Sequence, residues 1–113
     1  LVDILIVDPA PAVAGDLEAG IDHRLGRFRI ALERHADRLA SVHVKDVAPD
    51  GENLDEDGWA DVGTGILDWA ALWPIAVRAG ASLMIAEHDK PSDFARFARV
   101  SADKMRKLAA AHA

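Results

Sequence analysis

The order of the secondary-structure patterns is the feature that most constrains how this chain of 113 residues can fold. Three apolar runs rich in Leu, Ile and Val, typical of buried strands, occupy residues 1–7, 40–47 and 82–89. Each run is followed by a segment with helical spacing of its apolar residues, at about residues 24–38, 69–79 and 92–108. Strands that alternate with helices indicate a parallel sheet. We therefore expect an α/β fold of three strand–helix units in one domain spanning residues 1–113.

Each predicted strand ends in an ionisable side chain. Asp8 follows the first strand, and His43 and Glu87 lie near the ends of the second and third. Neighbouring strands are about 4.8 Å apart, so side chains at the ends of adjacent parallel strands can converge on one ion. One imidazole with carboxylates suits Mn²⁺, Mg²⁺ or Co²⁺ better than a structural zinc. The sequence predicts a divalent metal site formed by His43, Glu87 and Asp8.

Structural interpretations of the same residues stay open. His43 could be a hydrogen-bonded interior histidine, Glu87 a charge at a strand end, and Asp8 the start of a turn before Pro9. Lys45 and Asp46 could pair with each other or with neighbours. We expect His88 to face the outer helices. In the last helix, which Pro91 or Ser92 is expected to open, the spacing places Arg96 toward water.

Residues 48–67 contain six acidic side chains and four glycines, without a helical or strand pattern. Long loops in compact domains are commonly functional or mobile, so this segment is expected to be a mobile cover over the strand ends. Gly63 and Gly65 are expected to allow positive φ there. Asp68 is expected to cap the helix that follows, and Gly80 to end it.

Three motifs, taken in order, carry a family resemblance. They are "HVKD" at residues 43–46, "DVGTGILDW" at 61–69 and "IAEHDKPSD" at 85–93. This set resembles the closing portion of the sugar phosphate isomerase/epimerase family, the xylose-isomerase-like TIM barrels. The resemblance implies that the chain forms the last three strand–helix units of a (β/α)₈ barrel. Because a whole barrel takes roughly 250 residues, we expect a C-terminal part of a longer protein.

The resemblance also implies a reaction. It makes His43, Glu87 and Asp8 metal ligands, and Glu87 also one of two glutamates that move a proton next to a carbonyl. The second glutamate would precede Leu1, so the segment alone is expected to be inactive. Lys45 and Asp46 become candidates for substrate binding. The implied parent is a metal-dependent isomerase or epimerase of a sugar or sugar phosphate, with a keto-inositol dehydratase or a non-catalytic fragment, stable only as an oligomer, as alternatives.

The amino-acid composition limits the kinds of partner that this chain is expected to bind. A net charge of −6 gives no general support for binding a phosphate backbone, and no apolar run reaches the roughly 20 residues of a membrane span. The absence of cysteine fits a reducing compartment, so a cytoplasmic protein with a small-molecule substrate is expected. The outer strands of three units would have unpaired edges, which favours a homo-oligomer.

Overall fold

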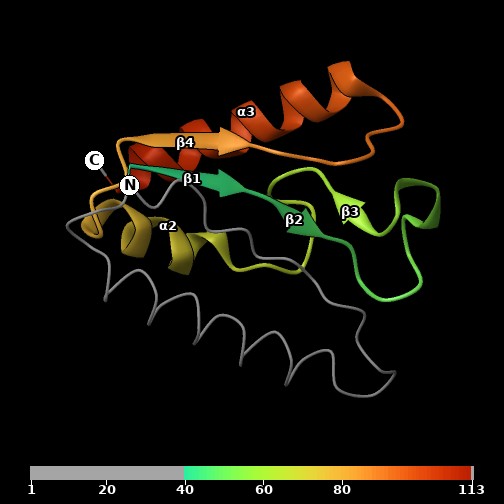
Figure 1. Cartoon of the computed structure of the whole chain (residues 1–113), viewed down its shortest axis with the longest axis horizontal. Coiled ribbons are helices and arrows are strands. Elements are labelled where there is room, and N and C mark those ends of the chain that lie inside the picture. The colour runs from blue at the N-terminus through green and yellow to red at the C-terminus, as the bar shows by residue number, and fades with distance from the viewer. Residues whose placement is uncertain (1–39, 113) are drawn as a thin grey trace.

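A computed structural model describes residues 40–112 of the chain. The predictions for residues 1–7, for Asp8 and for the helix at 24–38 lie outside this range. Within it the elements follow one another as β1 (Ser41–Val44), β2 (Asp46–Val47), a 3₁₀ helix η1 (Leu54–Glu56), β3 (Trp59–Ala60), α2 (Trp69–Arg78), β4 (Leu83–Ala86) and α3 (Phe94–Ala111) (Figure 1). The described part is therefore a mixed α/β structure.

Strands β1 and β4 run parallel and side by side (Figure 1). Their register pairs Ser41 with Leu83 and Val44 with Ala86. The chain connects the end of β1 to the start of β4 through α2, which is the crossover that a parallel pair requires. The predicted alternation of strand and helix is confirmed for these residues, with a third strand shorter than the predicted 82–89.

The two faces of this strand pair differ. Val42 and Val44 are fully buried, and with Met84 and Ala86 on β4 they join the core formed with α2 and α3. Because side chains alternate along a strand, the opposite face carries His43. It also carries the apolar residues of β4 that are most exposed, Leu83 at 55% and Ile85 at 37%. One face thus packs on helices, while the other bears the predicted site histidine.

Helix α2 has the ends that the sequence indicates. The Asp68 carboxylate accepts a hydrogen bond from the Ala71 N–H, and Gly80 follows the helix with a φ of 101°. The helix continues through Pro74. The apolar face predicted for this helix is buried, since Trp69, Leu72, Trp73, Ile75, Ala76 and Ala79 all belong to the core.

Helix α3 begins slightly later than predicted. Its N-cap is Asp93, whose carboxylate accepts a hydrogen bond from the Arg96 N–H, and not Pro91 or Ser92. Ser92 instead donates to the Glu56 carboxylate, which holds it in the preceding loop. Phe97, Ser101 and Leu108 of this helix are buried, whereas Phe94 is 70% exposed. No helix among residues 40–112 is long and apolar enough to cross a membrane.

Most of residues 48–67 has no regular secondary structure, as the sequence suggested, but the segment also contains η1 and β3. Strands β2 and β3 pair antiparallel, Asp46 with Ala60 and Val47 with Trp59, and η1 lies in the connection between them. Ala60 and Val62 are buried. The alternating pattern expected of a strand is missing because β2 and β3 have only two residues each. We call residues 46–60 the acidic hairpin.

Candidate functional site

His43 and Glu87 meet at the carboxyl ends of the two parallel strands. His43 lies on β1, and Glu87 is the first residue after β4, where its N–H donates to the Val44 carbonyl at 3.0 Å. The imidazole Nδ1 contacts the carboxylate Oε2. Both atoms are buried, and among the described residues each has no polar partner apart from the other. The contact thus joins a buried nitrogen and a buried oxygen that meet no other polar atom of the described residues.

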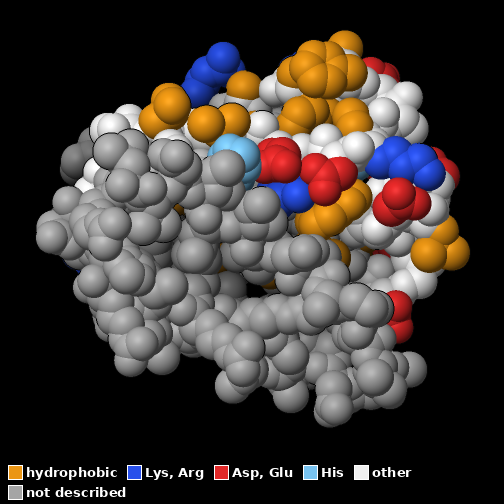
Figure 2. Space-filling view, viewed as in Figure 1, with side chains coloured by type: hydrophobic (Ala, Val, Ile, Leu, Met, Phe, Trp, Pro, Cys, Tyr) orange, Lys and Arg blue, Asp and Glu red, His pale blue; other side chains and the backbone are white. Residues whose placement is uncertain are grey.

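Lys45 supplies the positive charge of this site. Its side chain is only 5% exposed, and its ammonium lies 2.9 Å from Asp89 Oδ2 and 3.4 Å from Glu87 Oε1. The same ammonium lies 4.0 Å from the centroid of the Trp59 ring, a cation–π distance. The hydrogen bond from Lys45 holds the pKa of Asp89 below its ordinary value. Figure 2 shows histidine, acidic and basic side chains gathered on this face of the molecule.

The two carboxylates and one ammonium leave a net negative charge beside His43. The two carboxylate oxygens of Glu87 have different neighbours: Oε2 contacts the imidazole of His43, and Oε1 faces the ammonium of Lys45. A remaining negative charge, together with an available imidazole nitrogen, favours a cation over an anion at this point.

Asp46 lies next to this site but faces away from it. Its side chain is fully buried. Four backbone N–H groups donate to its carboxylate, those of Val47 and Gly63 at 2.9 Å and of Gly65 and Leu67 at 3.1 Å. Burial raises the pKa of Asp46, against the lowering effect of these four donors. The structure gives this carboxylate a backbone-binding role within the fold.

The loop at residues 63–67, whose N–H groups donate to Asp46, leads into a residue that contacts the site. Trp69, the first residue of α2, donates its indole N–H to the Lys45 carbonyl at 2.7 Å. Gly63 has the positive φ that was predicted, 87°. Gly65 does not have a positive φ and is needed for close approach, because a Cβ there would lie 2.2 Å from Asp46 Oδ1. Asp46 therefore fixes the loop that precedes Trp69, and Trp69 is the residue that donates to the Lys45 carbonyl.

A second group of charges joins α3 to the acidic hairpin and to Asp61, the residue that follows the hairpin. Arg96 donates to Glu56 at 2.6 Å and to Asp61 at 2.9 Å, so the prediction that it faces water is wrong. The backbone and hydroxyl hydrogen bonds from Ser92 and the bond from Arg96 lower the pKa of Glu56 to about 2. His88 packs edge-on against Phe97 of α3, as expected, with Nε2 3.8 Å from Glu56 Oε1. Arg96 was placed wrongly because helical spacing does not show a carboxylate brought in from another segment.

Of the predicted site residues, the structure brings together His43, Glu87 and Lys45. Asp8 lies outside the described residues, and between residues 40 and 112 no group of three His, Cys, Asp or Glu side chains could hold a metal ion. The sequence reasoning missed Asp89 and Trp59, which complete the surroundings of Lys45. The position of Asp89, two residues after Glu87, was a signal for it, whereas nothing in the sequence distinguished Trp59.

Comparison with known proteins gave no relative. No protein-family model, curated protein or solved structure matches the chain.

Proposed function

We propose that His43 and Glu87 belong to a divalent metal site in an enzyme that moves a proton next to the carbonyl of a sugar or sugar phosphate. The observation that carries the proposal is the contact between His43 Nδ1 and Glu87 Oε2 at two adjacent parallel strand ends, with both atoms buried and each the other's only polar partner among the described residues.

The donor set fits a metal such as Mn²⁺, Mg²⁺ or Co²⁺. One imidazole nitrogen and one carboxylate oxygen already face each other, and Asp8 is proposed as a further carboxylate ligand. When bound, such an ion supplies Lewis-acid stabilisation of the negative charge that develops on substrate oxygens. The net negative charge left by Glu87, Asp89 and Lys45 supports a cation at this place.

Glu87 is the proposed proton carrier. Its Oε2 points to His43 while Oε1 is 3.4 Å from the Lys45 ammonium, so the carboxylate is held at both oxygens. A positioned carboxylate can take the proton from the carbon next to the carbonyl and return it to a neighbouring carbon, which is the proton balance of an isomerisation. Lys45 orients this base and lies close enough to the site to contact a substrate oxygen.

The proposed parent fold is a xylose-isomerase-like TIM barrel. Two features support it: a parallel pair with helical packing on one face, and His43, Leu83 and Ile85 on the other. The inner face of a barrel needs apolar side chains in layers, with functional side chains at the carboxyl ends of the strands. In this proposal the substrate is a small sugar in a cytoplasmic, non-membrane protein, and Asp46 serves the fold and not the substrate.

The test uses the full-length product of the gene that encodes this chain. The protein is incubated with Mn²⁺ and a panel of aldoses, ketoses and their phosphates in deuterated water, and exchange of the α-hydrogen is followed by NMR. Exchange without water loss supports an isomerase or epimerase, and exchange with loss of a hydroxyl indicates the dehydratase. We expect Glu87→Gln to slow exchange at least about a hundredfold, since it removes the base and keeps the shape.

A matched change separates chemistry from folding. Glu52→Gln removes a carboxylate from the exposed part of the acidic hairpin and should leave exchange unchanged. The proposal fails if Glu87→Gln exchanges as fast as Glu52→Gln, or if no sugar exchanges in a protein that is folded and loaded with metal.

A further inference from the structure

The two loops that follow β1 and β4 occupy the position at which TIM barrels commonly bind a phosphate group. Such a phosphate site is formed by the loops after the seventh and eighth strands, together with the N-terminus of a helix. In the proposed parent fold β1 and β4 are the last two strands, so these loops are residues 45–68 and 87–93. A phosphate on the substrate would therefore have to meet the groups of these two loops.

The backbone N–H groups of the glycine-containing segment after β1 already hold a carboxylate. Phosphates in proteins are commonly bound by the N–H groups of glycine-rich loops. Here the N–H groups of Gly63 and Gly65 donate to Asp46 at 2.9 and 3.1 Å, and the Leu67 N–H donates to the same side chain at 3.1 Å. A carboxylate of the chain itself thus uses the donors that a phosphate would need.

The two helix N-termini at these loops are also capped by carboxylates. A helix N-terminus attracts phosphate because its N–H groups and its dipole favour negative charge. The Asp68 carboxylate accepts from the Ala71 N–H at the start of α2, and the Asp93 carboxylate accepts from the Arg96 N–H at the start of α3. Since Ser or Asn caps a helix about as well as Asp does, aspartate at both caps adds a negative charge that would repel a phosphate.

The lysines of the two loops are paired with carboxylates. The buried Lys45 ammonium lies 2.9 Å from Asp89 and 3.4 Å from Glu87. The exposed Lys90 ammonium lies 3.3 Å from Asp57 on the acidic hairpin. The positive charge of both loops is therefore already balanced by carboxylates of the chain.

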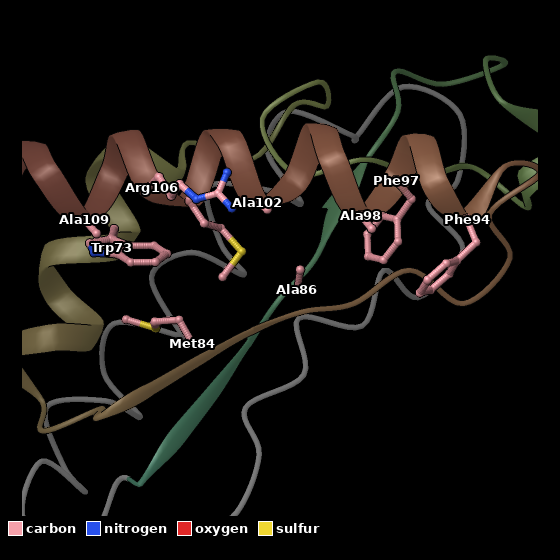
Figure 3. Close-up of a pocket in the computed structure, with 10 residues that line it drawn as sticks. Trp73, Met84, Ala86, Phe94, Phe97, Ala98, Ala102, Arg106 and Ala109 are labelled. Atoms are coloured by element: carbon pink, nitrogen blue, oxygen red, sulfur yellow. The ribbon is translucent and has the colours of Figure 1, made fainter.

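The other cationic residues among residues 40–112 belong to the helices. They are Arg78 on α2 and Arg96, Arg99, Lys104, Arg106 and Lys107 on α3. Of these, Arg96 is bound to Glu56 and Asp61. Figure 3 shows Arg106 beside the apolar groove between α3 and β4. Both helices pack on the face of the strand pair opposite His43, so apart from Arg96 their cations lie across the sheet from the candidate site.

The side chains at the candidate site suit hydroxyl groups. Glu87 and Asp89 are both partly exposed, and their carboxylate oxygens can accept hydrogen bonds from hydroxyls. The Lys45 ammonium can donate to a carbonyl or hydroxyl oxygen. Because two carboxylates surround one ammonium, the net negative charge of this group repels a phosphate dianion but not a hydroxyl.

We propose that the substrate is a sugar without a phosphate group, whose hydroxyl and carbonyl oxygens meet Glu87, Asp89 and Lys45. This inference rests on the proposed function and narrows its substrate class. The N–H and ammonium groups that would bind a phosphate are already held by carboxylates of the chain. A phosphate ester would have to displace one of these carboxylates or bind beside it against the repulsion of like charges.

The first experiment compares matched substrates in the full-length protein loaded with Mn²⁺. Exchange of the α-hydrogen with deuterated water is measured by NMR for each aldose and ketose of the panel and for its terminal phosphate ester. We expect kcat/KM for exchange to be at least about tenfold higher for the free sugar than for its ester. An ester that exchanges as fast as its free sugar overturns the inference and leaves the proposed function in place.

A change of charge tests the reason for the preference. Asp89→Asn removes a negative charge beside Lys45 and should raise the ratio of kcat/KM for the ester to that for the free sugar at least about fivefold. The ratio is the readout because any effect on Lys45 or Glu87 that slows both substrates cancels in it. Asp103→Asn removes the same charge from an exposed position of α3 and should leave the ratio unchanged. Equal ratios in the two variants overturn the inference.

A binding measurement separates this inference from the proposed function. Saturation-transfer NMR on the unmodified protein detects contact with each sugar and each ester without requiring turnover, and it decides the matter if Asp89→Asn does not fold. We expect stronger transfer to the free sugars than to their esters at equal concentration. Binding of free sugars without exchange would support the inference while refuting the proposed function. Stronger binding of the esters, or binding of neither class, overturns the inference.

Discussion

The carboxylate of Asp46 offers the sharpest test of how the fold is held together. Asp46→Asn keeps the size and shape of the side chain but replaces one of two accepting oxygens with a donating nitrogen. Each oxygen accepts from two backbone N–H groups: Oδ1 from Val47 and Leu67, Oδ2 from Gly63 and Gly65. In either orientation of the amide, two N–H groups that contact this buried carboxylate therefore lose their acceptor and face another donor.

The size of the effect follows from these contacts. A buried donor left without a partner costs about 1–3 kcal/mol, so two cost about 2–6 kcal/mol when both are fully buried, and less where water reaches them, as at the exposed Gly63. Burial raises the pKa of Asp46, which means that the ionised side chain carries a desolvation cost that Asn avoids. We therefore expect the lower part of the range, a loss of about 2–4 kcal/mol in the free energy of unfolding at neutral pH.

Urea unfolding followed by far-ultraviolet circular dichroism measures the loss, and hydrogen exchange locates it. The amides of Gly63, Gly65 and Leu67 should exchange faster in Asp46→Asn. Asp50→Asn removes the same charge from an exposed position and should change the stability by less than about 0.5 kcal/mol. If Asp46→Asn is as stable as Asp50→Asn, the four hydrogen bonds do not hold the loop and our reasoning is refuted.

Three further predictions concern the same framework. Gly65→Ala should destabilise the fold by at least about 2 kcal/mol in the same urea assay, because its Cβ would lie 2.2 Å from Asp46 Oδ1 and 2.3 Å from the Val47 carbonyl; a neutral effect would show that the loop can shift. Asp68→Ala should cost about 1 kcal/mol of stability through loss of the N-cap of α2, and the more conservative Asp68→Asn should restore most of it. The pKa of Glu56 is about 2, below its ordinary value of 4.5, so its contribution to stability is complete above about pH 4.5 and disappears as the pH falls toward 2. Thermal melting across this range should show a smaller loss on acidification in Glu56→Gln than in the unmodified chain, and equal losses would contradict the role of Glu56.

The sequence predicted most reliably what depends on short-range pattern. The apolar face of α2, its cap at Asp68 and its end at Gly80 follow from spacing and local hydrogen bonding, and the structure has all of them. The juxtaposition of His43 and Glu87 was also predictable, because parallel strands in α/β folds end at one edge.

Contacts between distant segments were not predictable. The bond from Arg96 to Glu56 spans 40 positions, and the four donors to Asp46 include residues 17 to 21 positions away. Neither contact produces a periodic pattern in the sequence. A charged residue is predicted to be exposed unless its distant partner is known. For the same reason residues 48–67 were expected to be irregular, although Asp46 and Arg96 attach both sides of this segment to the rest of the fold.

The pairing of His43 with Glu87 as metal ligands is tested most directly by titrating the chain with Mn²⁺ and measuring bound ion by electron paramagnetic resonance. We expect at most one bound ion per chain, with affinity reduced about a hundredfold by His43→Ala and by Glu87→Gln, because each removes one ligand. The matched variants His112→Ala and Glu52→Gln, both at exposed positions, should bind as the unmodified chain does. Equal Mn²⁺ affinity in all five proteins would contradict the metal site and leave the contact between His43 and Glu87 as a structural ion pair.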